Sequence, residues 1–235
     1  MIDEITIKNW NKEFRKQSPE KVLQFFLEFF KGKIALSSSL GLEDQVLTEM
    51  VTAIDHTLKI FTLDTGRLFP ETYDLIDRTS SRFKKRIEVY FPDAAQIEDM
   101  VNTKGVNLFY ESVENRKLCC HLRKIEPLTR ALKGLDAWIT GLRQEQSITR
   151  NHLQMIEWDK NNNLLKINPL INWTEEDVNK YIKEKNIPFN PLHKQGFASI
   201  GCQPCTRAIE PGEDVRAGRW WWENPETKEC GLHKR

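Results

Sequence analysis

The stretch "KIALSSSLGLEDQVLTEMV", residues 33–51, determines the fold class that we predict for this chain. An apolar strand over 33–37 runs into a Ser/Gly turn, and the turn opens a helix. Further strands are predicted within 58–66, 86–92 and 137–141, and helical patterns separate them. Strands that alternate with helices favour a parallel sheet covered on both faces. The sequence therefore predicts an α/β, doubly wound domain.

The rest of the chain extends this domain at both ends. Apolar residues at helical spacing over 20–33 predict an amphipathic helix stopped near Gly32. Two strand-like runs around an Asn-rich turn in 152–168 predict a hairpin at the sheet edge. Thr174 predicts the N-cap of a late helix that ends before Pro188.

Three regions follow from this reading of the elements. They are an N-terminal helical region (1–30), an α/β domain (31–187) and a C-terminal segment (188–235).

Composition argues against several classes of function. The chain has 35 Lys and Arg against 34 Asp and Glu, so no global field favours nucleic acid or an anionic membrane. The first residues, "MIDEITIKNWNKEF", lack a signal-peptide core, and no run of about 18 apolar residues occurs in the sequence. We therefore expect a soluble cytoplasmic protein, in which five cysteines favour metal binding or catalysis over a disulfide framework.

Two turns rich in small or polar residues follow neighbouring strands. Ser37–Ser39 begin a turn that opens a helix, where we expect unpaired backbone N–H groups to meet an anion. At the end of the next strand, Asp64 and Thr65 are placed to bond a ribose or a base edge, and Gly66 lets the backbone approach a ligand. Either turn alone is equally compatible with a ligand-free loop, but together they favour a nucleotide crevice.

Two arginines follow the strand at 137–141. Arg143 and Arg150 lie in "AWITGLRQEQSITR", and guanidinium groups suit phosphate or sulfate because they present several donors in a fixed fork. The alternative is a pair of ordinary surface arginines.

Four of the five cysteines fall into two pairs. Cys119 and Cys120 are adjacent, and Cys202 and Cys205 form a C-x-x-C, which together indicate a four-thiolate site for zinc or an iron–sulfur cluster. Adjacent helical residues diverge by about 100°, so the first pair suits the separated irons of a [4Fe-4S] cluster better than one tetrahedral ion. A buried thiol pair with an unrelated loop is the third interpretation.

The fifth cysteine, Cys230, lies in the terminal "KECGLHKR". The cationic residues that follow it lower a thiol's pKa and raise its thiolate fraction, which is typical of a nucleophile. The alternative is an incidental terminal thiol.

Three basic residues are spaced to act on an anion near these thiols. Lys124 follows Cys120 by four positions and would project over the same side of one helix, close to both cluster and cleft. Arg216 and Arg219 are three apart and would share a face on a helical turn. The tryptophans at 220–222 favour a packing or hinge element over a base-stacking platform.

Six motifs in order resemble the assimilatory sulfonucleotide reductases, specifically the iron–sulfur adenosine 5'-phosphosulfate (APS) reductases, relatives of the 3'-phosphoadenosine-phosphosulfate (PAPS) reductases. They are "SSSLGLED", "LDTGRLFPETY", "CCHLRKIEPL", "WITGLRQEQS", "GCQPCT" and "ECGLH", which run from about residue 33 to the C-terminus. The resemblance implies an adenine nucleotide alpha hydrolase-like fold. The serine turn resembles the pyrophosphate loop of ATP pyrophosphatases but lacks its double glycine, which argues against room for a triphosphate.

The resemblance also implies roles for individual residues. It implies that a [4Fe-4S] cluster is held by Cys119, Cys120, Cys202 and Cys205. It assigns the cluster-side lysine to Lys124, the substrate arginines to Arg216 and Arg219, the tail histidine to His233 and the nucleophile to Cys230.

The implied reaction is reduction of APS to sulfite and AMP through an enzyme S-sulfocysteine. Because the other four thiols would be ligands, the reductant must be external, and a dithiol protein such as thioredoxin or a glutaredoxin-like protein fits thiol-exchange chemistry. The alternatives are PAPS or dual APS/PAPS reduction and, from another class, a metal-stabilised RNA-binding module. A homo-oligomer is compatible with the sequence, which does not define the oligomeric state.

Overall fold

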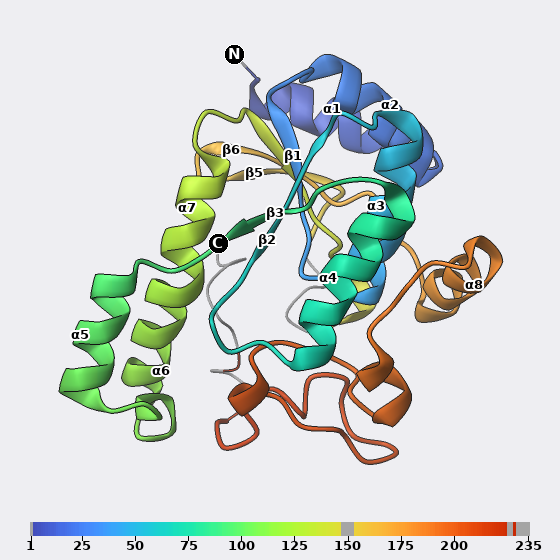
Figure 1. Cartoon of the computed structure of the whole chain (residues 1–235). Helices are drawn as coiled ribbons and strands as arrows, with labels where there is room; N and C mark the ends of the chain where they lie inside the picture. Colours follow the sequence, from blue (N-terminus) through green and yellow to red (C-terminus); the bar gives the residue numbers. More distant parts are fainter. Residues whose placement is uncertain (1, 147–152, 225–227, 229–235) are drawn as a thin grey trace.

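A twisted sheet runs through the centre of the protein (Figure 1). The computed structural model describes residues 2–146, 153–224 and 228. In this part of the chain the sheet has six strands, which are β1 (Ile34–Ser37), β2 (Lys59–Leu63), β3 (Glu88–Tyr90), β4 (Ala137–Ile139), β5 (Ile156–Asp159) and β6 (Leu164–Ile167).

The strand order explains where a ligand can bind. The order is β3-β2-β1-β4-β6-β5, and every neighbouring pair is parallel except β5 and β6 at one edge. The chain leaves β1 toward β2 and β3 on one side and returns to β4 on the other, so the order reverses between β1 and β4. Ligands of doubly wound sheets bind outside the carboxyl ends of the strands at such a switch point. The predicted fold class and the hairpin at the sheet edge are confirmed.

Helices cover both faces of the sheet, with α7 on one side and α3 and α4 on the other (Figure 1). The helices begin at recognisable caps, since Gly41 is the N-cap of α3 and Thr174 forms a capping box with Asp177 in α8. Their bounds are α1 (Glu4–Phe14), α2 (Pro19–Phe29), α3 (Leu42–Ile54), α4 (Pro70–Phe83), α5 (Ala94–Lys104), α6 (Val113–Cys120), α7 (Glu126–Leu132) and α8 (Glu175–Lys185).

Alternate residues of the central strands supply two apolar cores. Ile34 and Leu36 of β1 join the core under α2, α3 and α8, whereas Ala35 faces the smaller core under α7. In β4, Trp138 joins the smaller core while its neighbours join the larger one. Burial on both faces is what an internal parallel strand requires.

The N-terminal helices belong to the larger core. Trp10, Phe14 and Phe26 are buried there together with strand residues of the α/β domain. Helix α2 packs on α3, and α1 contacts β5. The predicted boundary at residue 30 therefore separates stretches of sequence that share one packed interior, and the division into regions stays a prediction.

The segment between β3 and β4 forms a near-continuous helical rod. Helix α6 ends at Cys120, a π-helical turn covers His121–Ile125, and α7 follows directly. After α8 the chain passes through short 3-10 turns at Pro191–Gln195 and Gln203–Cys205. Among the described residues, no helix combines the length and the apolar character needed to cross a bilayer.

Candidate active site

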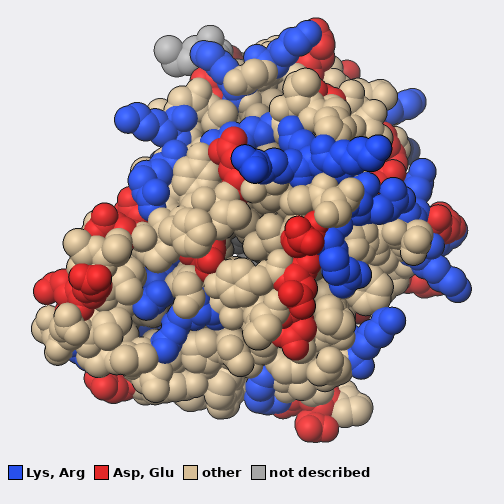
Figure 2. Space-filling view, in the orientation of Figure 1, with Lys and Arg blue, Asp and Glu red and all other residues tan. Residues whose placement is uncertain are grey.

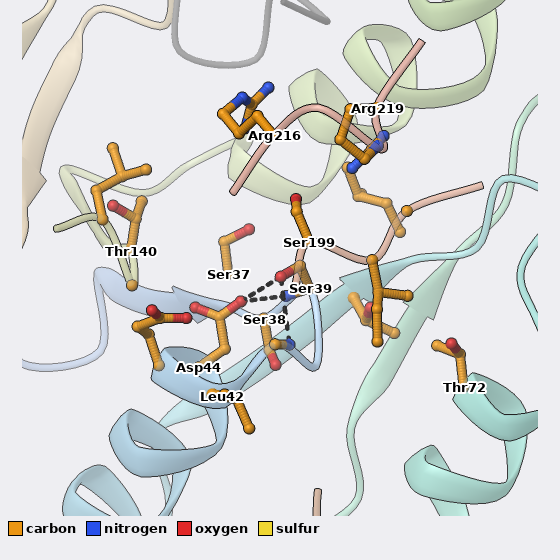
Figure 3. Close-up of a pocket in the computed structure, with 18 of the residues that line it drawn as sticks. Ser37, Ser38, Ser39, Leu42, Asp44, Thr72, Thr140, Ser199, Arg216 and Arg219 are labelled. Atoms are coloured by element: carbon orange, nitrogen blue, oxygen red, sulfur yellow. Dashed lines mark hydrogen bonds between the residues drawn. The ribbon is translucent and has the colours of Figure 1, made fainter. Parts of the chain in front are cut away.

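A cavity of about 260 Å³ opens beyond the carboxyl ends of β1 and β4, where the strand order reverses. The serine turn after β1 and the residues after β4 form one side, and the C-terminal segment forms the other (Figure 3). Its volume is near the lower end of the range for small-molecule sites. The fold therefore brings together stretches of sequence that lie as far apart as residues 37 and 220.

The serine turn is closed by its own hydrogen bonds. The carboxylate of Asp44 accepts from Ser39 N and Ser39 Oγ, both at 2.6 Å (Figure 3). Ser38 N donates to Phe61 O, and Ser38 Oγ accepts from Leu40 N at 3.1 Å. The prediction of unpaired N–H groups in this turn is therefore wrong for Ser38 and Ser39, because a neighbouring carboxylate and a strand carbonyl accept from them. Ser37, Ser38 and Ser39 all line the cavity.

Asp44 links the turn to the end of β4. Burial raises the pKa of Asp44 to about 6, although the hydrogen bonds from Ser39 and from the Gly141 backbone oppose the rise. A Cβ at Gly141 would overlap Asp44 Oδ1 and lie 2.9 Å from Glu43 Cβ. Glycine is needed at 141 because α3 and the end of β4 approach so closely.

The three basic residues predicted to act on an anion near the thiols all line the cavity, and so does Arg143. Arg216 and Arg219 lie across it from the serine turn, with Ser199 between (Figure 3), and Lys124 comes from the π-helical turn. Arg219 Nε donates to Cys205 O at 3.3 Å, and the guanidinium lies 4.7 Å from the Trp220 ring. A backbone turn joins Arg219 N to Arg216 O at 2.9 Å. The structure thus places the three predicted cations around one cavity.

The other predicted nucleotide contacts are placed differently. Arg143 lines the cavity, but its Nε pairs with Glu43 Oε1 at 2.7 Å in a mostly buried ion pair. Thr65 also lines the cavity. Asp64 and Gly66 are not among its lining residues. Asp64 Oδ1 accepts from Gly66 N at 2.7 Å and from Tyr73 OH at 2.9 Å, and its contact with a ribose or base edge stays a prediction.

The four paired cysteines lie around a second, smaller cavity next to the first. Cys119, Cys120, Cys202 and Cys205 are buried free thiols that belong to one apolar cluster. Cys202, Lys124, Arg219 and Trp220 line both cavities. The thiol cavity and the larger cavity therefore share a wall.

Electrostatics distinguish the thiols. Burial alone would raise the pKa of Cys202, but Lys124, the hydrogen bond with Thr65 Oγ1 and Arg219 together lower it below the usual thiol value. Burial and the neighbouring Cys202 raise the pKa of Cys205 to about 12. The cationic side chains therefore favour negative charge on the thiol nearest the larger cavity.

The donor set and its surroundings fit an iron–sulfur cluster. Trp220 Nε1 and Arg123 Nε are buried N–H groups without a hydrogen-bond partner among the described residues, and both side chains line the thiol cavity. Buried donors require acceptors, and thiolate or sulfide sulfur would supply them. No group of three or more His, Cys, Asp or Glu in the described ranges is arranged to hold a single metal ion.

Three predicted residues lie outside the described part of the chain. They are Arg150, Cys230 and His233. Lys228 is described, and its carbonyl accepts a hydrogen bond from Arg216 Nη2 at 3.1 Å. The backbone two positions before Cys230 is thus in contact with a residue of the larger cavity.

Several cavity residues were missed from the sequence. Ser199 and its neighbours over 198–201 line the larger cavity. The Ser-Ile-Gly sequence before Cys202 was the only feature of the sequence that could have indicated them. His193 also lines the cavity, and its Nε2 is buried without a described partner. Asp44 is an acidic residue in the first turn of the helix that follows the serine turn, and this position could have indicated that it lies at the cavity. None of these signals indicates by itself which side chains face a common space.

The tryptophans and the surface charge bear on the RNA-binding alternative. Trp220 is 1% exposed, and its ring lies 4.9 Å from the guanidinium of Arg116 and 4.7 Å from that of Arg219, so it is a packing residue as predicted, whereas Trp221 is 40% exposed. Figure 2 shows basic side chains in a row across the upper part of the face drawn, with acidic side chains mostly below it and at the edges. A buried indole such as that of Trp220 offers no platform on which a base could stack.

Comparisons with known proteins agree with this site. Residues 33–208 match the model of the phosphoadenosine phosphosulfate reductase domain. The chain is 56% identical over 202 residues to adenosine 5'-phosphosulfate reductase of Allochromatium vinosum, covering 86% of this chain and 79% of the relative. It is 52% identical over 201 residues to the Burkholderia cepacia protein of that name, covering 86% and 80%.

A solved structure supports the same relationship. The phosphoadenylyl-sulfate (PAPS) reductase of Candida auris, in a phosphate complex, superposes with a TM-score of 0.77 at 29% identity, covering 89% of this chain and 98% of that one. The Candida glabrata FMN adenylyltransferase, with a TM-score of 0.56 at 16% identity over 97% of this chain and 78% of that one, shows the shared fold alone. On the family match and these relatives, the chain belongs to the phosphoadenosine phosphosulfate reductase domain family.

Proposed function

We propose that this protein reduces adenosine 5'-phosphosulfate to sulfite and AMP, with electrons from a dithiol protein such as thioredoxin. The observation that carries the proposal is the shared wall between a cavity lined by Lys124, Arg216 and Arg219 and a site of four buried thiols. The relatives named adenosine 5'-phosphosulfate reductase support the choice of substrate.

The proposed nucleophile is Cys230. Its thiolate attacks the sulfur of the sulfate–phosphate anhydride, the S–O bond to the bridging oxygen breaks, and AMP leaves. The product is an S-sulfocysteine on the enzyme. The electron pair of the thiolate forms the new S–S bond, and the pair of the broken S–O bond leaves with AMP.

The three cations stabilise the charge that develops in this step. Negative charge increases on the bridging oxygen and is already present on phosphate and sulfate, so preorganised Lys and Arg donors bind the transition state best. Loss of one such contact is expected to lower the rate on the order of 10²- to 10³-fold.

The described part of the tail supports delivery of Cys230 to the cavity. The contact between Arg216 and the Lys228 carbonyl fixes the backbone two residues before the thiol. Two residues span at most about 7 Å of extended chain, so Cys230 is within reach of the cavity lining.

Four thiols would hold the cofactor. We propose that Cys119, Cys120, Cys202 and Cys205 bind a [4Fe-4S] cluster, which would supply a fixed iron–sulfur charge distribution beside the substrate. Lys124 and Arg219 border both cavities and therefore connect this charge to the substrate anion.

Release of sulfite needs an external dithiol. One thiolate of the reductant attacks the Cys230 sulfur and displaces sulfite, and its second thiol then resolves the mixed disulfide. The reductant is oxidised to a disulfide while the sulfur of the substrate is reduced from sulfate to sulfite.

The nucleophile is tested by Cys230→Ser. We expect the variant to keep its iron content and its affinity for AMP but to lose turnover, because a hydroxyl cannot replace the thiolate. Mass spectrometry of the wild-type protein mixed with APS, without reductant, should locate the sulfonate on the peptide that contains residue 230. Normal turnover by the variant would refute the assignment.

The ligand set is tested by Cys202→Ser. Anaerobically purified wild-type protein should contain iron and acid-labile sulfide with broad visible absorption, and the variant should lose both. Wild-type iron content in the variant would exclude Cys202 as a ligand, and zinc in the wild-type protein would favour the single-ion alternative.

The second candidate substrate is PAPS. The family model and the Candida auris structure both carry the name of the phosphorylated nucleotide. Comparing kcat/KM for the two nucleotides decides between them, and we expect the value for APS to be higher.

A further inference from the structure

A buried ion pair joins helix α6 to the end of the described C-terminal segment. Arg116 Nε donates to Glu223 Oε1 at 2.9 Å, and Arg116 Nη2 donates to Glu223 Oε2 at 2.8 Å. The two side chains are 0% and 3% exposed. This is a bidentate pair almost entirely removed from water.

Burial distinguishes this pair from a similar one nearby. Arg207 and Glu213 also form a bidentate pair in the C-terminal segment, at 2.8 and 2.9 Å, but their side chains are 37% and 33% exposed. Burying two charges is costly, so a buried pair is weak evidence for stability alone, and its best-attested use is to fix one arrangement of the chain. We therefore expect the buried pair to fix the position of the C-terminal segment on helix α6.

Arg116 has further contacts at the thiol site. It lies three residues before Cys119 on the same helix, and its guanidinium lies 4.9 Å from the Trp220 ring. It also interacts electrostatically with Cys120 and forms a hydrogen bond with it. One side chain thus contacts a proposed cluster ligand, the indole beside the cavity and the carboxylate at 223.

The chain beyond Glu223 leads to the proposed nucleophile. Cys230 follows Glu223 by seven residues. The Lys228 carbonyl between them accepts from Arg216 in the substrate cavity. The tail therefore has an upstream contact at the thiol helix and a downstream contact at the substrate cavity.

We propose that Arg116 and Glu223 are positioning residues that fix the root of the nucleophile-bearing tail to the helix of the thiol pair. The pair sets the point on the molecule from which the tail starts toward the cavity. Because Arg116 also contacts Cys120, the tail starts directly beside the thiol pair. The proposal rests on the proposed function of Cys230.

The expected cost of losing the pair follows from geometry. A misplacement of about 1 Å, caused by a change far from the chemistry, lowers rates on the order of 10²-fold. Arg116 and Glu223 are not among the residues that line the larger cavity, so the nucleotide should still bind with its usual affinity. The rate of S-sulfocysteine formation should fall while the affinity for AMP stays the same.

The test compares Glu223→Gln with the matched control Glu213→Gln. Each change removes one carboxylate charge from a bidentate pair with arginine in the same segment. Three quantities are measured on each anaerobically purified protein: iron content, the Kd of AMP, and the single-turnover rate of adduct formation at Cys230 by mass spectrometry. We expect Glu223→Gln to form the adduct on the order of 10²-fold more slowly, with iron and Kd within twofold of wild type, and Glu213→Gln to match the wild type.

Two results from these variants would overturn the proposal. One is adduct formation by Glu223→Gln at the wild-type rate. The other is a slower rate accompanied by an equal loss of iron or AMP affinity, because the pair would then stabilise the fold as a whole and would not position the tail.

A double variant covers the case in which Glu223→Gln does not fold. Arg116→Met with Glu223→Leu removes both charges, so no unpaired buried charge remains. We expect this protein to fold, to keep iron content and AMP affinity within twofold of wild type, and to form the adduct slowly. A wild-type rate, or a slow rate with an equal loss of iron, would overturn the proposal. Failure of the proposed function gives a different result, because the wild-type protein itself would then carry no adduct at Cys230. The positioning role of Arg116 and Glu223 would be refuted together with it.

Discussion

Asp44 illustrates at the scale of a single residue how the serine turn is organised. The sequence predicts that the serine turn binds an anion. In the structure the Asp44 carboxylate accepts two hydrogen bonds from Ser39 in this turn. Leu40 next to it has a φ of +62°, a left-handed conformation that costs a leucine roughly 1–2 kcal/mol. The hydrogen bonds around Asp44 hold the turn in this conformation.

Titration of Asp44 gives a prediction of pH dependence. Its pKa in the folded protein, about 6, lies above its usual value of 3.8, so the folded state holds the proton more tightly. Its contribution to stability is present at low pH and is lost as pH rises from about 4 to about 6. The free energy of unfolding of the wild type, relative to Asp44→Asn, should fall on the order of 3 kcal/mol over this range and stay constant above it. Urea unfolding at a series of pH values measures the difference.

Asp177 provides a control of opposite sign. The backbone and side-chain hydrogen bonds with Thr174 lower the pKa of Asp177. Its contribution is therefore present above about pH 4 and is lost as pH falls further. A difference between wild type and Asp44→Asn that does not vary with pH would show that Asp44 does not titrate as described.

At the scale of an element, the rod from α6 to α7 shows what periodicity can predict. The sequence placed Cys119, Cys120 and Lys124 on one helix, and the structure has a π-helical turn at His121–Ile125 between them. Such turns are frequent at functional sites. A regular helical spacing could not predict the turn, because the widened turn depends on what packs around it rather than on local propensity.

Helix α8 was predicted closely because its start depends on neighbouring residues. Thr174 Oγ1 accepts from Asp177 N at 3.1 Å, and Thr174 N donates to Asp177 Oδ2 at 2.9 Å. Thr174→Ala should lower the free energy of unfolding by about 1 kcal/mol, because the backbone N–H of Asp177 loses its side-chain acceptor. Thr174→Ser is the control, since it keeps the hydroxyl and should lose much less. Equal losses in denaturant titrations would argue against the cap.

At the scale of the whole molecule, the N-terminal helices test the division into regions. Phe26 of α2 is 0% exposed in the larger core, whereas Phe29 of the same helix is 53% exposed. Phe26→Ala should lower the free energy of unfolding by about 3–5 kcal/mol, in one transition for the whole protein. Phe29→Ala should cost about 1 kcal/mol or less. A separate early transition of the N-terminal helices would show that they do not share the core.

The sequence by itself determined the features that depend on neighbours in the chain. The alternation of strands and helices predicted the doubly wound sheet, Thr174 predicted a cap, and the cysteine pairs predicted a four-thiol site whose members the fold brings to one cavity. These features follow from periodicity, capping and side-chain chemistry, which act over a few residues.

Only the tertiary structure decided which partners the polar side chains have within the protein. Asp64 and Arg143 were predicted to meet a nucleotide, and in the structure Asp64 also bonds to Tyr73 and Arg143 to Glu43. The pairing of Arg116 with Glu223, 107 residues away, has no local signal in the sequence. A side chain's partner depends on which distant segments pack beside it, and burial then makes that pairing obligatory because an unpaired polar group away from water is costly.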